Sequence, residues 1–302
     1  MIRISEENYT YYFDKDNKPI ATVSIGDKII FETLDCWGNK LKNDEDLNDY
    51  NNMSVVNPTA GPVFIKGAEA GDILVIKILD IQCKNHGILA LTPGEGVLRQ
   101  YVKAPLVKIV SIENRKTLFN NNIVINNKPH IGTIGTTPLD KIATGFIGIH
   151  GGNIDCPEAG VGAKIYLPIF VEGALLQMGD VHASMGEGEI CSSGVECSAE
   201  ITIEILEVIK NKFIASPIIE NENYWFILSN ALSFEEAVRI GVKRMADFIS
   251  KKMEISLEDA TLLLGIVGNV RIAQSAGIDN FDISIFIQFP KYVDKSGRLN
   301  RF

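Results

Sequence analysis

The segment from Ile73 to Ile81 is the part of the chain that most restricts how it can fold. Apolar side chains occur on both alternating faces of this run, as expected for a strand that is buried within packed sheets. Between Glu200 and Val208, isoleucines alternate with polar residues, so this strand is expected to have one face in water. The two patterns together predict a layered β structure.

Further short apolar runs of the β type follow one another through most of the chain, and most are bounded by Gly, Pro, Asn or Asp. Many short strands with frequent turns are typical of a sandwich or barrel-like core. We therefore predict a mainly β core for residues 1–210. The runs are Ala21 to Ile25, Ile29 to Phe31, Leu106 to Ile112, Ile123 to Ile125, Ile165 to Phe170 and Trp225 to Leu228.

Helical patterns occur late, in residues 211–302, which we predict to form an α+β portion packed on the core. Ser233 followed by Glu236 is a capping-box pattern, after which apolar residues recur at helical spacing. A second helix is predicted to begin at Ser256 and to end at Gly268. Its apolar stripe, expected in the core, comprises Leu262, Leu263 and Ile266, and a strand pair is predicted at Val270 to Ala273 and Ile283 to Ile287.

Composition narrows the class of protein. The chain has 302 residues, 46% hydrophobic and 22% charged, which is typical of a globular protein. A net charge of -9 without a concentrated basic surface argues against a nucleic-acid partner. The sequence has no apolar run as long as a membrane span and no secretion signal, so we expect no membrane partner and a cytoplasmic location. Five cysteines without a Cys-x-x-Cys pair are expected to be reduced thiols.

Histidines and carboxylates are concentrated between His150 and Glu196, where Lys164 is the only cation. Carboxylates at this density repel one another unless they are solvated, protonated or bridged by a metal ion. Glycines flank His150 and His182 and allow a ligand to approach the backbone closely. The alternative is a set of tight turns with two structural histidines, but the paired imidazoles in acidic surroundings favour a site.

Three motifs in order resemble the acetamidase/formamidase family: Gly61 to Asp72, His150 to Asp155, and Leu167 to Ala174 leading into Gly179 to Glu189. The resemblance covers most of the chain and is greatest to the shorter, acetamidase-type members. It implies a jelly-roll-like β-sandwich with α+β additions that hydrolyses short aliphatic amides to carboxylate and ammonia. Members of that family often have Gly-Asp-Gly-Glu where this chain has Gly-Glu-Gly-Glu, and the added methylene would move the carboxylate of Glu187.

Amide hydrolysis needs an activated nucleophile, a stabilised oxyanion and a proton for the leaving amine. The chain has neither a Gly-x-Ser-x-Gly elbow nor a His-Glu-x-x-His helix, and a divalent metal, with zinc the expected ion, can replace them. The candidate ligands are Asp35, His150, Asp155 and His182, of which at least one is expected to lie outside the coordination shell. A salt bridge or a turn cap is an equally good interpretation of Asp35.

Glu189 or Glu187 is the predicted base, which takes a proton from the attacking water and passes it to ammonia. A solvated acidic turn is the alternative for both residues. The groups predicted to contact the substrate are Asn153, the backbones of Gly151 and Gly152, and Trp37, which is also compatible with a core or interface position.

Other possibilities stay open at this point. Cys191 offers a thiolate nucleophile as a second mechanism, although free cysteines are commonly buried. A contrasting class of function is a non-catalytic jelly-roll module that holds calcium and a sugar or small ligand.

His86 and His130 lie beside Gly or Pro and are expected at the surface. The polar segment from Gly38 to Asn57 is expected to be an exposed loop over a pocket or in an oligomer contact, and a homodimer or higher homo-oligomer is expected.

Overall fold

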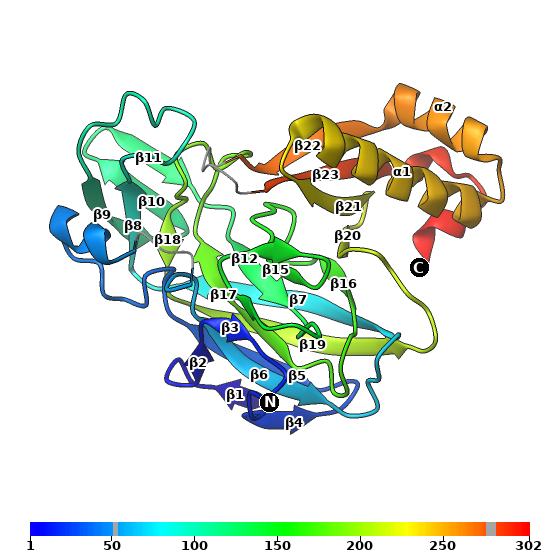
Figure 1. The fold of residues 1–302 in the computed structure, drawn as a ribbon, viewed down its shortest axis with the longest axis horizontal. Helices are drawn as coiled ribbons and strands as arrows, with labels where there is room; N and C mark the ends of the chain where they lie inside the picture. Colours follow the sequence, from blue (N-terminus) through cyan, green and yellow to red (C-terminus); the bar gives the residue numbers. More distant parts are fainter. Residues whose placement is uncertain (51–53, 276–281) are drawn as a thin grey trace.

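The computed structural model describes residues 1–50, 54–275 and 282–302, and within them the chain forms two large β-sheets, a small two-stranded sheet and two α-helices (Figure 1). The first sheet has the order β1 (Ile2–Ile4), β5 (Lys28–Thr33), β19 (Ala199–Ile209), β7 (Ile73–Cys83), β16 (Lys164–Pro168), β20 (Ile218–Glu220), β21 (Tyr224–Ala231), β23 (Ile283–Pro290), β22 (Asn269–Gln274). None of the described helices is both long and apolar enough to cross a membrane.

The second sheet contains the strands that carry most of the site described below. Its order is β11 (Ile123–Asn126), β10 (Lys116–Asn120), β9 (Leu106–Glu113), β8 (His86–Leu91), β18 (Glu196–Cys197), β17 (Leu176–His182), β12 (His130–Gly135), β15 (Gly151–Asn153), β14 (Ile147–Gly148). A branch adds β6 (Thr59–Ile65) to β17, and β2 (Tyr9–Thr10) and β4 (Ala21–Val23) to β6. The small sheet pairs β3 (Tyr12–Phe13) with β13 (Ile142–Ala143).

The main hydrophobic core lies between the two large sheets. The predicted interior strand is confirmed, because β7 pairs with β19 on one side and β16 on the other and its residues Ile73 to Ile76 are all buried. The predicted alternation of β19 is also confirmed, since Ile201, Ile203 and Ile205 are buried and the residues between them are partly exposed. The mainly β architecture expected from the sequence is therefore present.

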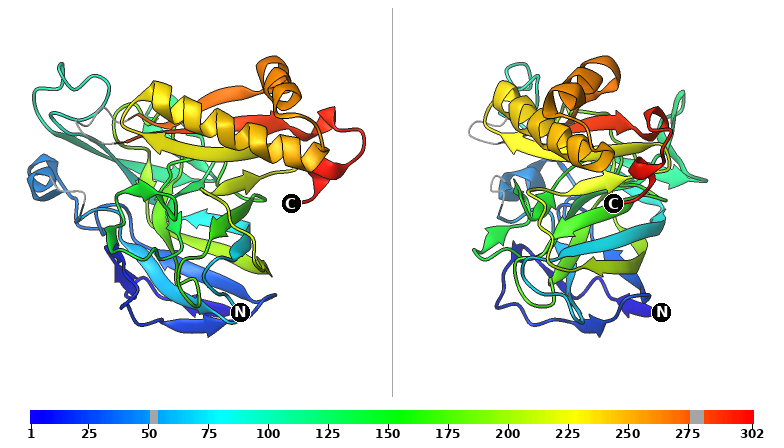
Figure 2. Two further views of the ribbon diagram at one scale, coloured as in Figure 1. Left: turned by 45° about the vertical axis from the view of Figure 1, so that its right-hand side comes forward. Right: turned by 90° about the vertical axis from the view of Figure 1, so that its right-hand side faces the viewer.

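The C-terminal strands extend the first sheet instead of forming a separate one. Helix α1 (Phe234–Met253) lies along β21 and β23, as the turned views show (Figure 2). Both predicted helix starts are confirmed: the hydroxyl of Ser233 accepts a hydrogen bond from the amide of Glu236, and that of Ser256 caps α2 (Leu257–Val267). The division into residues 1–210 and 211–302 stays a prediction.

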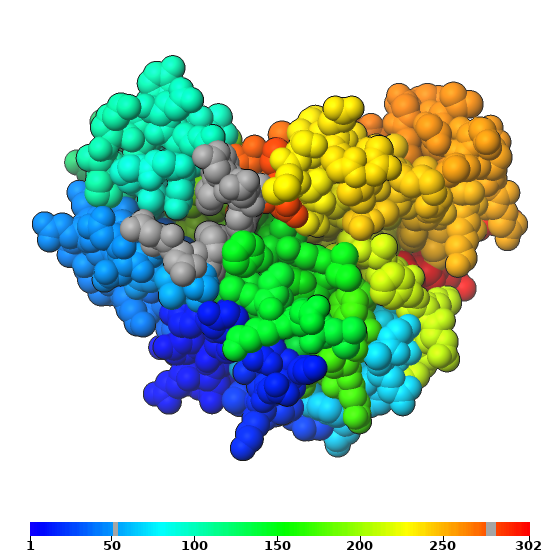
Figure 3. Space-filling view, in the orientation of Figure 1, coloured from blue at the N-terminus to red at the C-terminus, as the bar shows by residue number. Residues whose placement is uncertain are grey.

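The predicted core stripe of α2 is wrong at two positions. Leu262 and Ile266 are 66% and 76% exposed, whereas Ala260 and Leu264 are buried. The helix is apolar over more of its circumference than α1 and β23 can cover, so periodicity alone did not identify the buried face. In the space-filling view the C-terminal helices project at the upper right and residues around 95–125 project at the upper left (Figure 3).

In the described part of the segment from Gly38 to Asn57, which excludes residues 51–53, several side chains are buried and some line the pocket described below, as a loop over a pocket requires. The segment contains a 3-10 helix, η1 (Asp44–Tyr50), and its Leu47 and Val56 pack with Trp37 against Ile88 of β8. Two further 3-10 turns, η2 (Lys291–Val293) and η3 (Arg298–Asn300), precede the end of the chain. All five cysteines lie in the described residues and none forms a disulfide, as predicted.

Candidate functional site

The register of three neighbouring strands builds the centre of the site. Antiparallel pairing sets His130 of β12 opposite His182 of β17, and His182 opposite Glu196 of β18. Directly opposed residues in antiparallel strands project from the same face, so two imidazoles and a carboxylate form one row. The expectation that His130 lies at the surface is wrong, because its ring is fully buried and its centroid lies 5.0 Å from that of His182. His86 is exposed, as expected.

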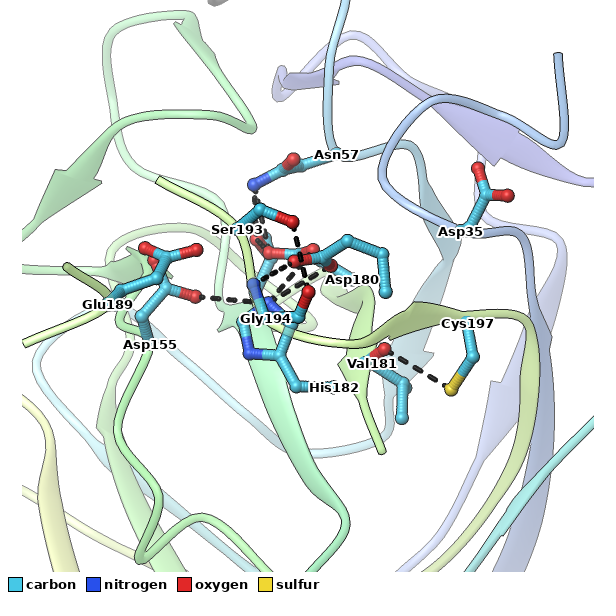
Figure 4. Close-up of polar contacts among 12 residues, drawn as sticks. Asp35, Asn57, Asp155, Asp180, Val181, His182, Glu189, Ser193, Gly194 and Cys197 are labelled. Carbon is cyan, nitrogen blue, oxygen red and sulfur yellow. Dashed lines mark hydrogen bonds and ion pairs between the residues drawn. The ribbon is translucent and has the colours of Figure 1, made fainter. Parts of the chain in front are cut away.

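Three carboxylates lie within 4 Å of the Nε2 atom of His182, and Figure 4 shows two of them, Asp155 and Asp180, beside the ring. The distances from Nε2 are 3.1 Å to Glu196 Oε2, 3.6 Å to Asp180 Oδ1 and 3.9 Å to Asp155 Oδ1. Glu189 presents a carboxylate oxygen within 4.8 Å of ligand atoms of both Asp155 and His182. All five side chains are buried. We call these five residues the acid cluster.

The backbone is strained where it presents these carboxylates. Asp155, Asp180 and Glu189 have φ angles of 39°, 54° and 42°, in the left-handed region that residues other than glycine rarely adopt. Gly132 lies beside them, and a Cβ atom there would be 2.6 Å from Asp180 Oδ2 and 2.7 Å from Asp155 Oδ1. Strained backbone concentrates at functional sites, where the surrounding structure enforces it. The fold therefore holds the carboxylates together against local preference.

Burial and mutual repulsion shift the pKa values of the cluster. Burial and the nearby charges of Glu189 and Asp180 raise the pKa of Asp155 well above its usual value. Burial raises the pKa of Glu189 to about 8, with a further increase from the charge of Glu196 and an opposing effect of His182. Burial alone would lower the pKa of His182, but the charges of Glu196 and Asp180 outweigh it and hold that pKa well above normal. Without a cation, the cluster must retain protons.

Hydrogen bonds to His130 fix the orientation of His182. His130 Nδ1 lies 3.1 Å from the carbonyl oxygen of Lys128, which can only accept, so this nitrogen carries the proton. Burial and the charge of His182 lower the pKa of His130 to about 3, so its Nε2 has a free lone pair and accepts from His182 Nδ1 at 3.2 Å. When His182 has lost its Nε2 proton, the lone pair of that nitrogen therefore points at the carboxylates. A metal ligand needs this tautomer.

A pocket of about 70 Å³ opens onto the cluster. Its lining includes all four carboxylates and the predicted residues Trp37 and Asn153, with the remainder contributed by Cys36, Leu47, Tyr50, Val56, Asn57, Thr92, Glu95, Ser192 and Gln274. A larger cavity of about 740 Å³ lies beside α1, where Arg244 and Phe248 line it, but it contains no residue of the acid cluster. We therefore place the chemistry in the smaller pocket.

A polar network holds one wall of this pocket. The side-chain nitrogen Nδ2 of Asn57 donates to Asp180 Oδ2 at 2.9 Å and to Asn153 Oδ1 at 3.0 Å. The hydroxyl of Thr133 lies 3.0 Å from Asn153 Oδ1 and 3.1 Å from Asp180 Oδ2, so its single hydrogen can serve either oxygen. Because Asn153 Oδ1 faces these donors, its Nδ2 group is the end left for a ligand.

Strand β22 contributes two side chains that the sequence interpretation missed. Gln274 Nε2 donates to Asp155 Oδ2 at 2.6 Å and to Glu189 Oε2 at 2.7 Å. Arg271 pairs with Glu187 and, at 3.0 Å, with Glu158. Both residues lie far from the acidic stretch in sequence, and only the fold of the C-terminal strands brings them to it.

Several predicted site residues lie elsewhere. Asp35 is the turn cap considered above: its Oδ1 accepts from the amides of Trp37 and Asn39, and Figure 4 shows it apart from Asp155. The ring of His150 packs edge-on against Phe13, its pKa is lowered to about 4 by burial, and no contact joins it to the described acid cluster. The pair of rings in the site is therefore His130 with His182, not His150 with His182.

Glu187 also lies outside the cluster, because its side chain is 40% exposed and pairs with Arg271. Gly151 and Gly152 do not line the pocket. Their φ angles are positive, and a Cβ at Gly151 would lie 2.2 Å from the carbonyl oxygen of Ile134, so they allow β15 to pack against β12. Their predicted contact with substrate remains untested.

The thiol alternative receives little support. Burial and the charge of Glu189 raise the pKa of Cys191, so the thiol stays protonated near neutral pH. The residues after it form a turn, in which Ser193 donates to the carbonyl of Gly194 and Glu196 accepts from the Gly194 amide.

Comparison with known proteins identifies the family. A model of the Acetamidase/Formamidase family matches residues 4–146 and 148–287. The chain belongs to this family. It is 25% identical to the formamidase of Methylophilus methylotrophus over 62% of this chain and 60% of that protein. It is 25% identical to the acetamidase of Mycolicibacterium smegmatis over 56% of this chain and 58% of that protein, so it spans about three-fifths of these relatives.

Two solved structures cover almost the whole chain. The acetamidase from Bacillus halodurans is 34% identical, with a TM-score of 0.91 over 97% of this chain and 98% of that one. A predicted acetamidase/formamidase from Thermoanaerobacter tengcongensis is 36% identical, with a TM-score of 0.92 over 100% and 99%. The mainly β fold with its C-terminal α+β part is therefore that of the family.

Proposed function

We propose that this chain hydrolyses the carbon–nitrogen bond of short aliphatic amides to a carboxylate and ammonia. The observation that carries the proposal is the buried acid cluster that lines a pocket of about 70 Å³ in a chain of the acetamidase/formamidase family. This small volume suits a very small polar substrate.

A divalent metal, with zinc the expected ion, fits the residues present. Asp155 Oδ1 is buried without a hydrogen-bond partner, and a neutral His182 directs a lone pair at the same place. We propose that His182, Asp155 and Asp180 hold the ion, with Asp180 in place of the predicted Asp35 and His150. Such an ion, when bound, lowers the pKa of a water molecule and polarises the amide carbonyl.

The protein groups around it divide the remaining work. Glu189 takes a proton from the attacking water and delivers it to the departing nitrogen, a role that suits a buried carboxylate that lines the pocket beside Asp155. The Nδ2 group of Asn153 donates to the substrate carbonyl, whose oxygen becomes more negative in the transition state. Trp37 forms an apolar part of the pocket wall.

The alternative of a non-catalytic module that holds calcium and a sugar is less well supported. Calcium prefers a shell of six to eight oxygens, whereas the centre of this cluster is an imidazole nitrogen. The homo-oligomeric state and the cytoplasmic location expected from the sequence stay predictions.

The test is release of ammonia from acetamide and formamide by purified protein, with metal analysis of the same sample. We expect turnover that a chelator abolishes and added zinc restores. Asp155→Asn and Glu189→Gln should each lower kcat/KM by at least about a hundredfold. Glu187→Gln is the matched control, because that exposed carboxylate belongs to the same loop as Glu189 and should be dispensable.

Binding of acetamide without turnover, by protein that contains its metal, would refute hydrolysis and favour the binding module. Full activity in metal-free protein would refute the ion but leave amide hydrolysis intact.

A further inference from the structure

Gln274 occupies an unusual place, because it belongs to the C-terminal α+β part yet lies inside the acid cluster. It is the last residue of β22 and is 5% exposed. The backbone around it clamps the loop that carries Glu189: the Gly188 amide donates to the carbonyl of Ala273, and the Ser275 amide donates to that of Gly188. Gln274 is therefore held firmly at the pocket.

The orientation of its side-chain amide follows from its neighbours. Nε2 lies 2.6 Å from Asp155 Oδ2 and 2.7 Å from Glu189 Oε2, and both of its N–H groups are needed for these bonds. Turning the amide over would set its carbonyl oxygen against two carboxylate oxygens. With Asp155 and Glu189 ionised, the nitrogen therefore faces these two oxygens, and Oε1 points away from them.

That outward oxygen has no partner. Gln274 Oε1 is buried and accepts no hydrogen bond, and the side chain lines the pocket. Buried carbonyl groups are almost always paired in native proteins, so an unpaired one at a pocket wall indicates where a ligand donor binds. Five carboxyl side chains also line this pocket, and each is an acceptor when it is ionised.

We propose that Gln274 Oε1 accepts an N–H of the substrate amide nitrogen and so selects unsubstituted amides over esters. The inference rests on the proposed function and assigns the residue that recognises the nitrogen. An amide nitrogen presents two N–H donors, whereas the corresponding ester oxygen presents none and would leave Oε1 unpaired. Sites that hydrogen-bond a substrate N–H discriminate strongly against an analogue that lacks it.

The experiment compares acetamide with methyl acetate in two variants that lose the acceptor. Gln274→Lys retains donors for Asp155 and Glu189, and Gln274→Met retains neither donor nor acceptor. In both, the ratio of kcat/KM for acetamide to kcat/KM for methyl acetate should fall by about tenfold or more, the effect of one lost hydrogen bond. Glu187→Gln should leave the ratio unchanged.

The ratio separates recognition from positioning. If Gln274 only positioned the two carboxylates, Gln274→Lys, which keeps donors for both, would retain the wild-type ratio, and this result would overturn the inference while the proposed function stands. If wild-type protein hydrolysed neither compound, the proposed function would fail instead. Circular dichroism shows whether Gln274→Lys is folded, and a fall in ratio in this folded variant supports the proposal.

Discussion

Replacing His130 with phenylalanine tests the row of rings at the centre of the site. The change keeps an aromatic ring of similar size in β12 but removes the acceptor for His182 Nδ1, which lies 3.2 Å away. Both rings are at most 1% exposed, so water cannot replace the lost partner. A buried donor left unpaired costs about 1–3 kcal/mol, and we expect the free energy of unfolding to fall by this amount.

The same substitution should weaken the proposed metal site. Loss of the group that orients a ligating imidazole typically lowers metal affinity by about 10- to 100-fold. Urea denaturation measures the first effect, and competition with a chelator for zinc measures the second. His130→Gln is the control, because its carbonyl can accept from His182 and its amide can donate to Lys128. Unchanged stability together with unchanged zinc affinity in His130→Phe would refute the proposed orientation of His182.

Three further outcomes follow from the geometry. In metal-free protein Glu189 keeps its proton up to about pH 8, above its usual pKa of 4.5, so its contribution to stability is complete below about pH 4.5 and is lost as the pH rises through 8. Urea denaturation of Glu189→Gln in the presence of chelator, repeated at several pH values, should not show this loss. An equal slope of unfolding free energy against pH in wild-type protein and in the variant would contradict the prediction. Gly132→Ala should lower the free energy of unfolding by about 1–3 kcal/mol and displace Asp155 and Asp180, because the new Cβ would lie 2.6 Å from the carbonyl oxygen of Asp180. Wild-type amidase activity in this variant would contradict the expected displacement. Leu262→Lys should change the free energy of unfolding by less than about 0.5 kcal/mol, since that side chain is 66% exposed, and a large loss in dilute protein would place it in a buried contact.

Much of the fold could be predicted because its patterns are local. The apolar run of β7, the alternation of β19 and the serine caps of both helices each lie within a few neighbouring residues. The buried face of α2 could not be predicted from the sequence, because Leu262 and Leu264 are both apolar. Only the position of α1 decides which of them is covered.

Only those parts of the site that have a local sequence pattern were predicted. The acidic surroundings of His182 are visible in the sequence, since Asp180 and Glu196 are near it along the chain. His130 and Gln274 have no local pattern, because strand register and the late β22 bring them to His182 and Glu189. One available indication was missed: Asp180 and His182 are two residues apart and so lie on one face of a strand.

The position of β22 near the end of the chain has a consequence during synthesis. Asp155 and Glu189 leave the ribosome about a hundred residues before the glutamine that bridges them. Until residue 274 arrives, the nascent chain holds its acidic loop without that bridge or the guanidinium of Arg271. If the proposed reaction needs this bridge, a chain truncated before β22 should have no amidase activity even where the β core has folded.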